Sequence, residues 1–356
     1  MKKKNHLKEK EKDELDSLET SIDSDRASSN QSRHRTLLKS EKEHLKDASL
    51  AERGRVIAVS SRTWIIQPDS GGETVECIVA GAVNARNSDQ SLVAVGDFVR
   101  FLKESAQVDQ KILGMITEVE ERTTKLARKP AGKKVVQEQV LVSNVDQLII
   151  LMSAADPFYN KRLIDRYLIV ADKGELEPVI CINKTDLMDE DFIREDLAAY
   201  EKLEIPILLI SALKTKGLQP LKDILKDRTT VFSGPSGAGK STVTNTLLGS
   251  EAQATGGISR QTSKGTHTTT NAQMFQLPGG GYIVDTPGIR ELAAWQLDAD
   301  ELPFYFHEFD AYMHKCKFAP CTHTHEPGCA VKEAVENEEI DADRYQSYLQ
   351  ILGSLE

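Results

Sequence analysis

Residues 229–249 read TTVFSGPSGAGKSTVTNTLLG, and this segment decides the fold of the chain. The apolar run 229–233 predicts a buried strand, 234–241 a tight glycine-rich loop, and 242–249 a helix. In such a loop, backbone N–H groups curl around phosphate oxygens, and the helix N-terminus adds a partial positive charge. A chance glycine-rich turn would lack both flanks. The predicted phosphate contacts are Gly234, Pro235, Ser236, Gly237, Ala238, Gly239, Lys240, Ser241 and Thr242.

On both sides of this loop, strand-like and helix-like segments alternate. Apolar runs at 145–154, 178–183, 206–211, 272–277 and 281–286 predict strands. Helical patterns cover 161–174, ending at Gly174, and 192–203 and 218–225. Alternation of this kind indicates an α/β fold with a mostly parallel sheet covered on both faces.

The choice of base is indicated by two further strand ends. CINKTDL places Asn183, Lys184, Thr185 and Asp186 after an apolar run, in the pattern NKxD of GTP-binding proteins. A carboxylate at Asp186 can accept hydrogen bonds from the ring N–H and the exocyclic amine of guanine. Adenine offers no such donor pair, so it would leave buried groups unpaired. The next strand ends in Ser211 and Ala212, a sequence typical of the loop that reads the guanine carbonyl oxygen.

A third strand end, VDTPG at 284–288, completes the predicted GTP site. Asp285 is predicted to hold Mg²⁺ together with Ser241, and the Gly288 N–H to sense the γ-phosphate. The intervening loop SKGTHTTTNAQ supplies Thr268 or Thr269 as the switch threonine, with Thr269 the expected magnesium ligand.

The predicted catalytic residues are Lys240, which reaches the β- and γ-phosphates, and His267. Ile289 follows DTPG where many GTPases carry a water-orienting Gln, so isolated hydrolysis is expected to be slow. His267 lies in the switch loop and has the pKa range of a proton acceptor. The alternative is a solvent-exposed loop histidine.

The order of these motifs is circularly permuted. NKTD (183–186) comes about fifty residues and SAL (211–213) about twenty residues before the phosphate-binding loop, and no second NKxD follows DTPG. The same sheet can form if the usual last helix is joined to the usual first strand. The chain ends of the domain then open next to DTPG, so a change there can move the C-terminal region directly.

Cys316, Cys321, His323 and Cys329 form the pattern C-x4-C-x-H-x5-C. Three thiolates and one imidazole satisfy tetrahedral Zn²⁺ without an open position, which favours a structural site. His314 and His325 are competing candidates for the histidine ligand. Cys77 and Cys181 lie in apolar runs and are expected in the core.

The N-terminal third has a different sequence pattern. Five short β-rich runs between 54 and 119 predict a small barrel or sandwich, and an OB-like barrel is the commonest five-stranded form. Residues 1 to about 50 are charged and poor in aromatics, which predicts a mobile extension or a basic arm that orders on a partner.

Composition limits location and partners. No run of about 18 apolar residues and no signal-peptide core occurs, so we expect a cytoplasmic protein without a membrane partner. The net charge is -10, but 289–356 alone holds 5 basic and 14 acidic residues, whereas 122–134 holds six basic residues and no acid. A basic surface for nucleic acid therefore remains available. No heptad signal appears, so a monomer is expected.

The combination of a β-rich N-domain, NKTD–SAL–GPSGAGKST–DTPG and the Cys/His knot resembles the small ribosomal subunit biogenesis GTPases of the RsgA/YjeQ family. The resemblance covers about 54–350. It implies an OB-fold, a permuted GTPase domain and a helical zinc-binding domain, with GTP/GDP, Mg²⁺ and one structural Zn²⁺ as cofactors. It also implies His267 as the catalytic histidine, although Thr266 stands where family members usually carry Arg.

The family further implies binding to the small ribosomal subunit and its rRNA, with ribosome-stimulated hydrolysis in late assembly that releases other assembly factors and the protein itself. We expect four segments: a mobile extension (1–52), an OB-like barrel (53–120), the permuted GTPase domain (121–291) and the zinc-binding domain (292–356).

Two other readings compete with this one. A GTP-regulated module that binds a protein partner would suit the acidic balance. A P-loop kinase or ATPase would require NKTD and SAL to be accidental.

Overall fold

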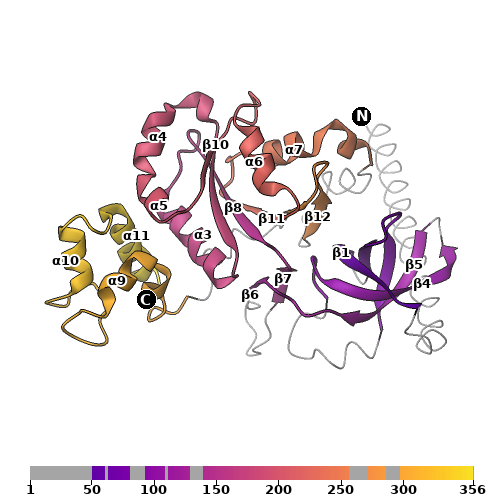
Figure 1. Cartoon of the computed structure of the whole chain (residues 1–356), viewed down its shortest axis with the longest axis horizontal. Coiled ribbons are helices and arrows are strands. Elements are labelled where there is room, and N and C mark those ends of the chain that lie inside the picture. Colours follow the sequence, from indigo (N-terminus) through magenta and orange to yellow (C-terminus); the bar gives the residue numbers. More distant parts are fainter. Residues whose placement is uncertain are drawn as a thin grey trace, which may run out of the picture. The chain divides into compact units, whose positions relative to one another are not determined.

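The structure is a computed structural model that describes residues 50–60, 63–80, 93–108, 111–128, 139–255, 272–285 and 297–355 (Figure 1). In these ranges the chain forms two compact units. The first contains most described residues up to Glu120. The second contains Ile57–Val59, residues 93–97 and everything from Glu121 onward.

The first unit is a five-stranded barrel, as predicted. Its strands are β1 (Glu52–Ser60), β2 (Thr63–Pro68), β3 (Val75–Val79), β4 (Phe98–Val108) and β5 (Lys111–Val119). They follow the order β1-β2-β3-β5-β4, and β4 pairs back with β1, which closes the barrel. Side chains alternate between the two faces of the strands, so Val75 and Cys77 of β3 share a face with Gly114 of β5, whereas Ile78 packs with Leu113 and Met115.

The second unit is built on a mostly parallel sheet. Its order is β10-β9-β8-β11-β13-β12. The strands are β8 (Gln147–Ser153), β9 (Glu177–Asn183), β10 (Ile207–Leu209), β11 (Thr229–Ser233), β12 (Gln273–Gln276) and β13 (Tyr282–Asp285). Only β12 runs antiparallel to its neighbour β13. β11 lies between β8 and β13. The fourth strand of this sheet in chain order is therefore at its centre.

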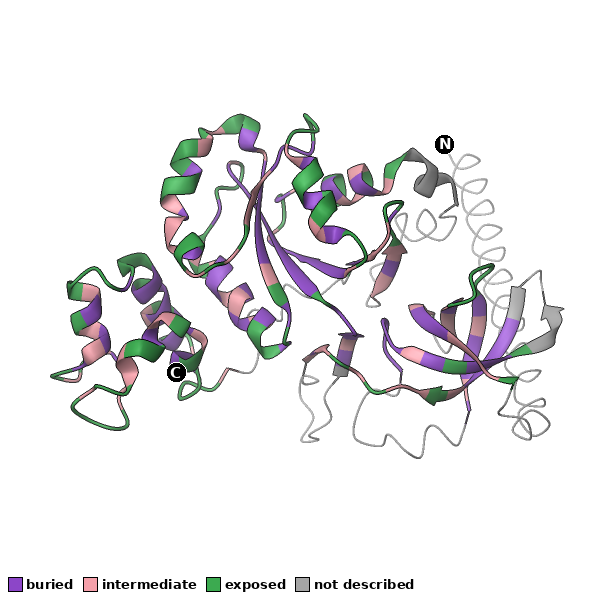
Figure 2. Ribbon diagram, viewed as in Figure 1, coloured by how far each residue is buried: buried purple, intermediate pink, exposed green. Residues whose placement is uncertain are grey.

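Helices cover both faces of this sheet, as alternation along β8 requires. Leu148, Ile150 and Met152 pack on one face against α3 (Lys161–Lys173), α4 (Glu190–Asp196) and α5 (Ala198–Lys202). Ile149 and Leu151 pack on the other against α6 (Leu218–Leu225) and α7 (Lys240–Thr255). The central strands are therefore buried throughout, whereas the helices expose one side (Figure 2).

Most helix boundaries agree with the sequence-based prediction. α3 begins after Asn160, whose side chain accepts from Leu163 N, and ends at Gly174. The single helix expected over 192–203 is instead two, α4 and α5, divided at Leu197. The buried Leu197 side chain anchors this break in the core. None of the helices in the described ranges has the length and apolarity to span a bilayer.

Part of the basic segment 122–134 is a strand, which was not predicted. β6 (Lys125–Arg128) pairs with β7 (Gln139–Ser143) in a separate two-stranded sheet. The buried Asp97 fastens this sheet, accepting hydrogen bonds from Arg122 at 2.7 Å and from Ser143 Oγ at 2.5 Å. At least Arg122 of this segment therefore serves a structural ion pair.

The C-terminal region is helical. It contains the short 3₁₀ turns η3 (Leu302–Tyr305) and η4 (His307–Phe309), and the helices α9 (Asp310–Met313), α10 (Ala330–Glu336) and α11 (Ala342–Leu352). Its own apolar cluster includes Phe306, Phe309 and Tyr348, whose rings pack within 5.4 Å of one another.

Candidate nucleotide and metal sites

The phosphate-binding loop follows β11, as predicted, and its glycines are required by geometry. Gly234 has φ +153°, and a Cβ there would lie 1.9 Å from Leu151 O. Gly239 has φ +90°, and a Cβ there would lie 2.4 Å from Asn183 Nδ2. Ser236, Gly237, Ser241 and Thr242 are exposed at the mouth of the loop, while Ala238 is buried beneath it.

Lys240 opens α7 and lies across this loop. Its Nζ donates to Gly234 O at 2.7 Å and to Pro235 O at 2.8 Å. These carbonyls hold the ammonium at the loop where β- and γ-phosphates are expected. The lysine is thus in place to exchange carbonyl partners for phosphate oxygens.

Asn183 joins three loops that are far apart in the sequence. Its Nδ2 donates to Ala238 O of the phosphate-binding loop at 3.0 Å. Its Oδ1 accepts from Ala212 N of the SAL loop at 3.1 Å. The side chain is buried, so both of its polar ends are satisfied by these neighbours. The predicted phosphate and guanine motifs therefore meet at one place.

Asp186 lies exposed in the short turn η2 (Thr185–Leu187). Its Oδ1 accepts from Ser211 Oγ at 2.5 Å. This hydrogen bond lowers the pKa of the Asp186 carboxyl, which keeps it ionised and able to accept from a donor pair. Thr185 is buried, and its N–H donates to Ile210 O at 3.1 Å, which fixes the turn against β10.

Asp285 ends β13 at the same edge of the sheet. Protein atoms around its carboxyl raise its pKa although the residue still reaches solvent, and the Lys240 ammonium opposes that shift. Because β13 pairs in parallel with β11, with Val284 opposite Val231, Asp285 lies at the strand end from which the phosphate-binding loop starts. His267, Thr268, Thr269 and Gly288 lie outside the described residues.

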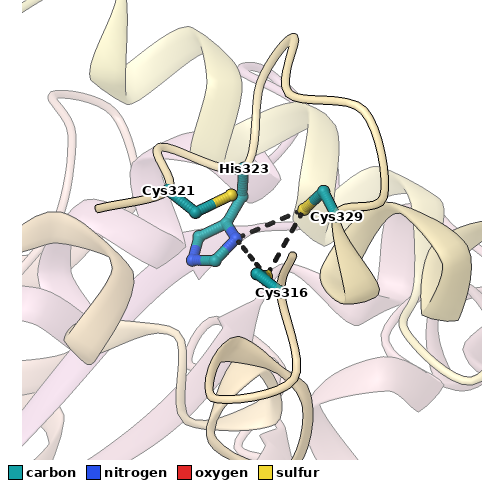
Figure 3. Close-up of side chains that lie close together, drawn as sticks. All are labelled: Cys316, Cys321, His323 and Cys329. Atoms are coloured by element: carbon teal, nitrogen blue, oxygen red, sulfur yellow. Dashed lines mark hydrogen bonds between the residues drawn. The ribbon is translucent and has the colours of Figure 1, made fainter. Parts of the chain in front are cut away.

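The four predicted zinc ligands converge (Figure 3). The ligand atoms of Cys316, Cys321, His323 and Cys329 all lie within 4.8 Å of one another. Cys316 Sγ is 3.6 Å from His323 Nδ1 and 3.9 Å from Cys329 Sγ. The edges of a tetrahedral zinc site with ordinary bond lengths are about 3.6–3.8 Å. The cluster found among the described residues includes His323 and neither His314 nor His325.

Hydrogen bonds from α11 hold the loop that carries these ligands. Tyr345 OH donates to His323 O at 2.7 Å, and Tyr348 OH donates to Thr322 O at 2.6 Å. Glu326 accepts from Thr322 N at 2.8 Å and Thr324 N at 3.0 Å. The ligand geometry is therefore supported by the surrounding fold.

The electrostatics of the cluster suit a divalent cation. Burial lowers the pKa of His323, so its imidazole is held neutral. Burial raises the pKa of Cys321 to about 12 and also raises that of Cys329. Without a cation the thiols keep their protons, and a bound cation would have to displace them.

The segment 155–157 was not predicted as part of the nucleotide site, although it contacts the predicted residues Lys184 and Gly237. Lys184 Nζ donates to Asp156 O at 2.5 Å and to Ala155 O at 3.4 Å. Pro157 lies against the phosphate-binding loop, since a Cβ on Gly237 would be 3.0 Å from its Cδ. The signal available in the sequence was position, because this segment follows β8 at the carboxyl edge of a parallel sheet.

Comparison with known proteins gives a consistent result. A family profile described as RsgA GTPase matches residues 119–295. A Small ribosomal subunit biogenesis GTPase RsgA from Chlorobaculum tepidum is 44% identical over 305 residues, covering 85% of this chain and 97% of the relative. The protein of the same name from Shewanella oneidensis is 35% identical over 317 residues, covering 88% of this chain and 86% of the relative.

Two solved structures are similar in fold. YjeQ from Thermotoga maritima superposes with a TM-score of 0.67 at 33% identity, covering 86% of this chain and 99% of that one. YloQ, described as a circularly permuted GTPase, superposes with a TM-score of 0.64 at 28% identity, covering 86% and 95%. The predicted permuted topology is thereby confirmed.

Proposed function

The chain belongs to the RsgA family of circularly permuted GTPases and is a GTP-hydrolysing enzyme, and from this premise we propose where it acts. It binds the small ribosomal subunit and its rRNA, and it hydrolyses GTP to GDP and phosphate in late assembly of that subunit. Hydrolysis is stimulated by the subunit and releases assembly factors and the enzyme itself. The names of the relatives support this proposal.

The observation that carries the guanine-nucleotide assignment is the position of Asn183. Its buried amide bonds the phosphate-binding loop at Ala238 and the SAL loop at Ala212, and Asn183 precedes Asp186 by three residues. A nucleotide bound there meets both loops at once. A kinase or ATPase would not need the Ser211–Asp186 pair, because adenine has no donor pair for the Asp186 carboxylate.

In this proposal each predicted residue has a defined task. Asp186 reads the guanine N–H groups, and Lys240 contacts the β- and γ-phosphates. Ser241, Asp285 and either Thr268 or Thr269 hold Mg²⁺, which neutralises phosphate charge when bound. Gly288 senses the γ-phosphate, and His267 orients the attacking water. The remaining nucleotide contacts are those predicted around Asn183, Ser211 and the phosphate-binding loop.

The Cys/His cluster is proposed to hold one structural Zn²⁺. Its spacing, its three thiols and its neutral imidazole fit that ion, and all four positions are filled by the protein. A bound zinc would cross-link the loop 316–329 to the start of α10.

We also propose the segment limits 53–120, 121–291 and 292–356, a cytoplasmic location and a monomeric state. The closed barrel pairing supports the first limit, and an apolar cluster drawn from the C-terminal region, with Ile169 of α3 added, supports the last.

The test is GTP hydrolysis with and without purified small ribosomal subunits, using the wild type and His267→Ala. We expect strong stimulation at low salt and loss of stimulation in the variant. Added salt should weaken stimulation steeply, because basic residues that bind rRNA phosphates release counterions and salt opposes that release. Stimulation that survives in the variant would retain the ribosome and remove the histidine from catalysis.

The absence of stimulation at low salt would instead favour a GTP switch for a protein partner, which the net charge of -10 suits. ATP competing equally with GTP would revive the ATPase reading.

A further inference from the structure

The C-terminal region packs on the outer face of α3 through mainly polar contacts. Ile169 is the α3 residue that enters the C-terminal apolar cluster in the described structure. The surrounding contacts are Lys161–Asp343 at 2.8 Å, Arg162–Gln350 at 2.8 Å, Arg166–Ser354 at 2.7 Å, Lys173–Glu301 at 3.3 Å and His307–Asp172 at 3.2 Å. An interface with this composition resembles those of separable domains more than the inside of one domain.

At the centre of this interface lies Arg344 of α11, whose side chain is only 5% exposed. Its Nη1 bonds Asp165 of α3 at 2.5 Å. Its Nε and Nη2 bond the carboxylate of Glu308 at 2.7 and 3.0 Å. The guanidinium also lies 5.5 Å from the Tyr200 ring and 4.6 Å from the Phe306 ring. One side chain therefore binds elements of both the sheet domain and the C-terminal region.

This buried charge cluster is specific but incompletely satisfied. Asp165 is 1% exposed, and its Oδ2 has no hydrogen bond. Burial raises the pKa of Asp165 even with Arg344 beside it. Carboxylates raise the pKa of Arg344 although burial lowers it, so the guanidinium stays charged. Well-packed apolar residues would stabilise such an interface at least as strongly. The buried charges therefore contribute more to the specific orientation of the C-terminal region on α3 than to its binding free energy.

A surface cleft borders the junction. A cleft of about 420 Å³ lies beside Arg344, between α5 and the C-terminal helices. Its lining includes Lys202, Leu203 and Ile340. The cleft opens to solvent, since Lys202, Glu338 and Glu339 on its walls are exposed, so the edge of the junction is hydrated.

The loop that precedes α3 contacts the nucleotide site. The helix starts at Lys161, directly after the loop in which Lys184 binds Asp156 O and Pro157 lies against Gly237. Ser153 Oγ donates to Pro157 O at 2.5 Å, which fixes this loop at the end of β8. The loop 155–157 thus contacts the guanine and phosphate motifs, and α3, which follows it after Asn160, contacts the C-terminal region along its outer face.

We propose that Arg344 is a positioning residue that docks the C-terminal region on α3 and couples this docking to occupation of the nucleotide site. The coupling runs through α3 and its leading loop, and so does not depend on the covalent link after Asp285. This inference rests on the nucleotide site proposed above. Because coupling is reciprocal, nucleotide must tighten docking by the same factor by which docking tightens nucleotide binding.

The test is hydrogen exchange, followed by mass spectrometry on the full chain with zinc retained, with and without GDP. In the wild type we expect GDP to slow exchange in 229–249 and also, by about fivefold or more, in α11. This comparison needs no variant, so it remains decisive if a substitution prevents folding.

The variant Asp165→Asn/Glu308→Gln/Arg344→Met removes all three charges together, so that no buried charge is left unpaired. We expect GDP still to protect 229–249 but no longer to affect α11, and the dissociation constant of a fluorescent GDP to rise by the factor lost in α11. Arg162→Met, which removes a peripheral contact of the same interface, is the matched control and should behave as wild type.

Each alternative outcome has a distinct meaning. If GDP protects 229–249 of the wild type while α11 does not respond, the coupling is overturned. If Arg162→Met abolishes the response as fully as the triple variant, the assignment to Arg344 is overturned. If GDP leaves 229–249 unchanged in the wild type, the proposed nucleotide site fails and the coupling fails with it.

Discussion

At the scale of single residues, the site depends on side chains that satisfy two loops at once. Asn183 was predicted as part of NKTD, but its bonds to Ala238 and Ala212 could be found only from the structure. A motif states which residue types are needed at one strand end. It does not state which neighbouring loop will carry their partners, because that depends on the packing of three strands.

Asp186→Asn tests guanine selectivity. The amide loses an acceptor and gains a donor that faces the guanine donors, so GDP should bind more weakly. Xanthosine diphosphate, with a carbonyl in place of the exocyclic amine, should gain affinity. Calorimetric titration measures both ligands. Asp189→Asn, at the cap of α4, is the control, and unchanged GDP affinity in Asp186→Asn would refute the assignment.

Gly239→Ala tests the backbone of the phosphate-binding loop. The position has φ +90°, and the new Cβ would collide with Asn183 Nδ2. We expect a backbone penalty of about 1–3 kcal/mol in addition to the clash, seen as lost GDP binding and a lower unfolding midpoint. Gly279→Ala, whose Cβ would meet no atom within 4 Å, should change neither.

At the scale of elements, the regular segments were predictable and the irregular ones were not. α3 and its end at Gly174 follow from helical periodicity and a glycine stop. The strand β6 was missed because four residues in a basic run carry too little alternation to be recognised. The division of α4 from α5 at Leu197 depends on where that side chain finds a buried position.

α11 is expected to control metal retention through its tyrosine hydroxyls. Tyr345→Phe and Tyr348→Phe each leave a backbone carbonyl without its bond, which should cost about 0.5–1.5 kcal/mol. We expect faster zinc loss to a chelator from both variants, most from the double variant. Tyr312→Phe on α9 is the control, and equal loss rates in all four proteins would contradict this role.

Zinc affinity should rise steeply with pH. Burial raises the pKa of Cys321 to about 12 and raises that of Cys329, so these thiols are protonated near pH 7 before metal binds. Each thiolate ligand therefore releases one proton, whereas His323, with its lowered pKa, is already neutral. Competition with a chelator between pH 6.5 and pH 8 should give a logarithmic slope of at least about 2, one for each of Cys321 and Cys329. A flat profile would argue against thiolate ligation.

At the scale of the whole molecule, the two units should respond differently to ligand. The described residues of the nucleotide site all belong to the second unit. GDP at about 100 times its dissociation constant should stabilise that unit by about 2.7 kcal/mol. Calorimetry should show one transition moving upward and the barrel transition staying in place. A uniform shift of all transitions would mean that the units unfold together.

The packing of the C-terminal region on α3 could not have been predicted from the sequence. Asp165, Glu308 and Arg344 are separated by more than a hundred residues at their widest, and none belongs to a recognisable motif. Charged residues on helices are usually solvated, so burial of these three is a property of the tertiary arrangement alone.

The position of β11 between β8 and β13 also matters while the chain is being synthesised. β11 ends at Ser233, 80 residues after β8 ends at Ser153, which corresponds to about 4–16 s of translation. Until then one edge of β8 has unpaired backbone groups, and such edges recruit other strands. GTP cannot help at this stage, because the loop that would hold its phosphates is still unmade. The nascent chain must therefore be shielded from its neighbours during an interval in which an unpermuted GTPase would already have made its phosphate-binding loop.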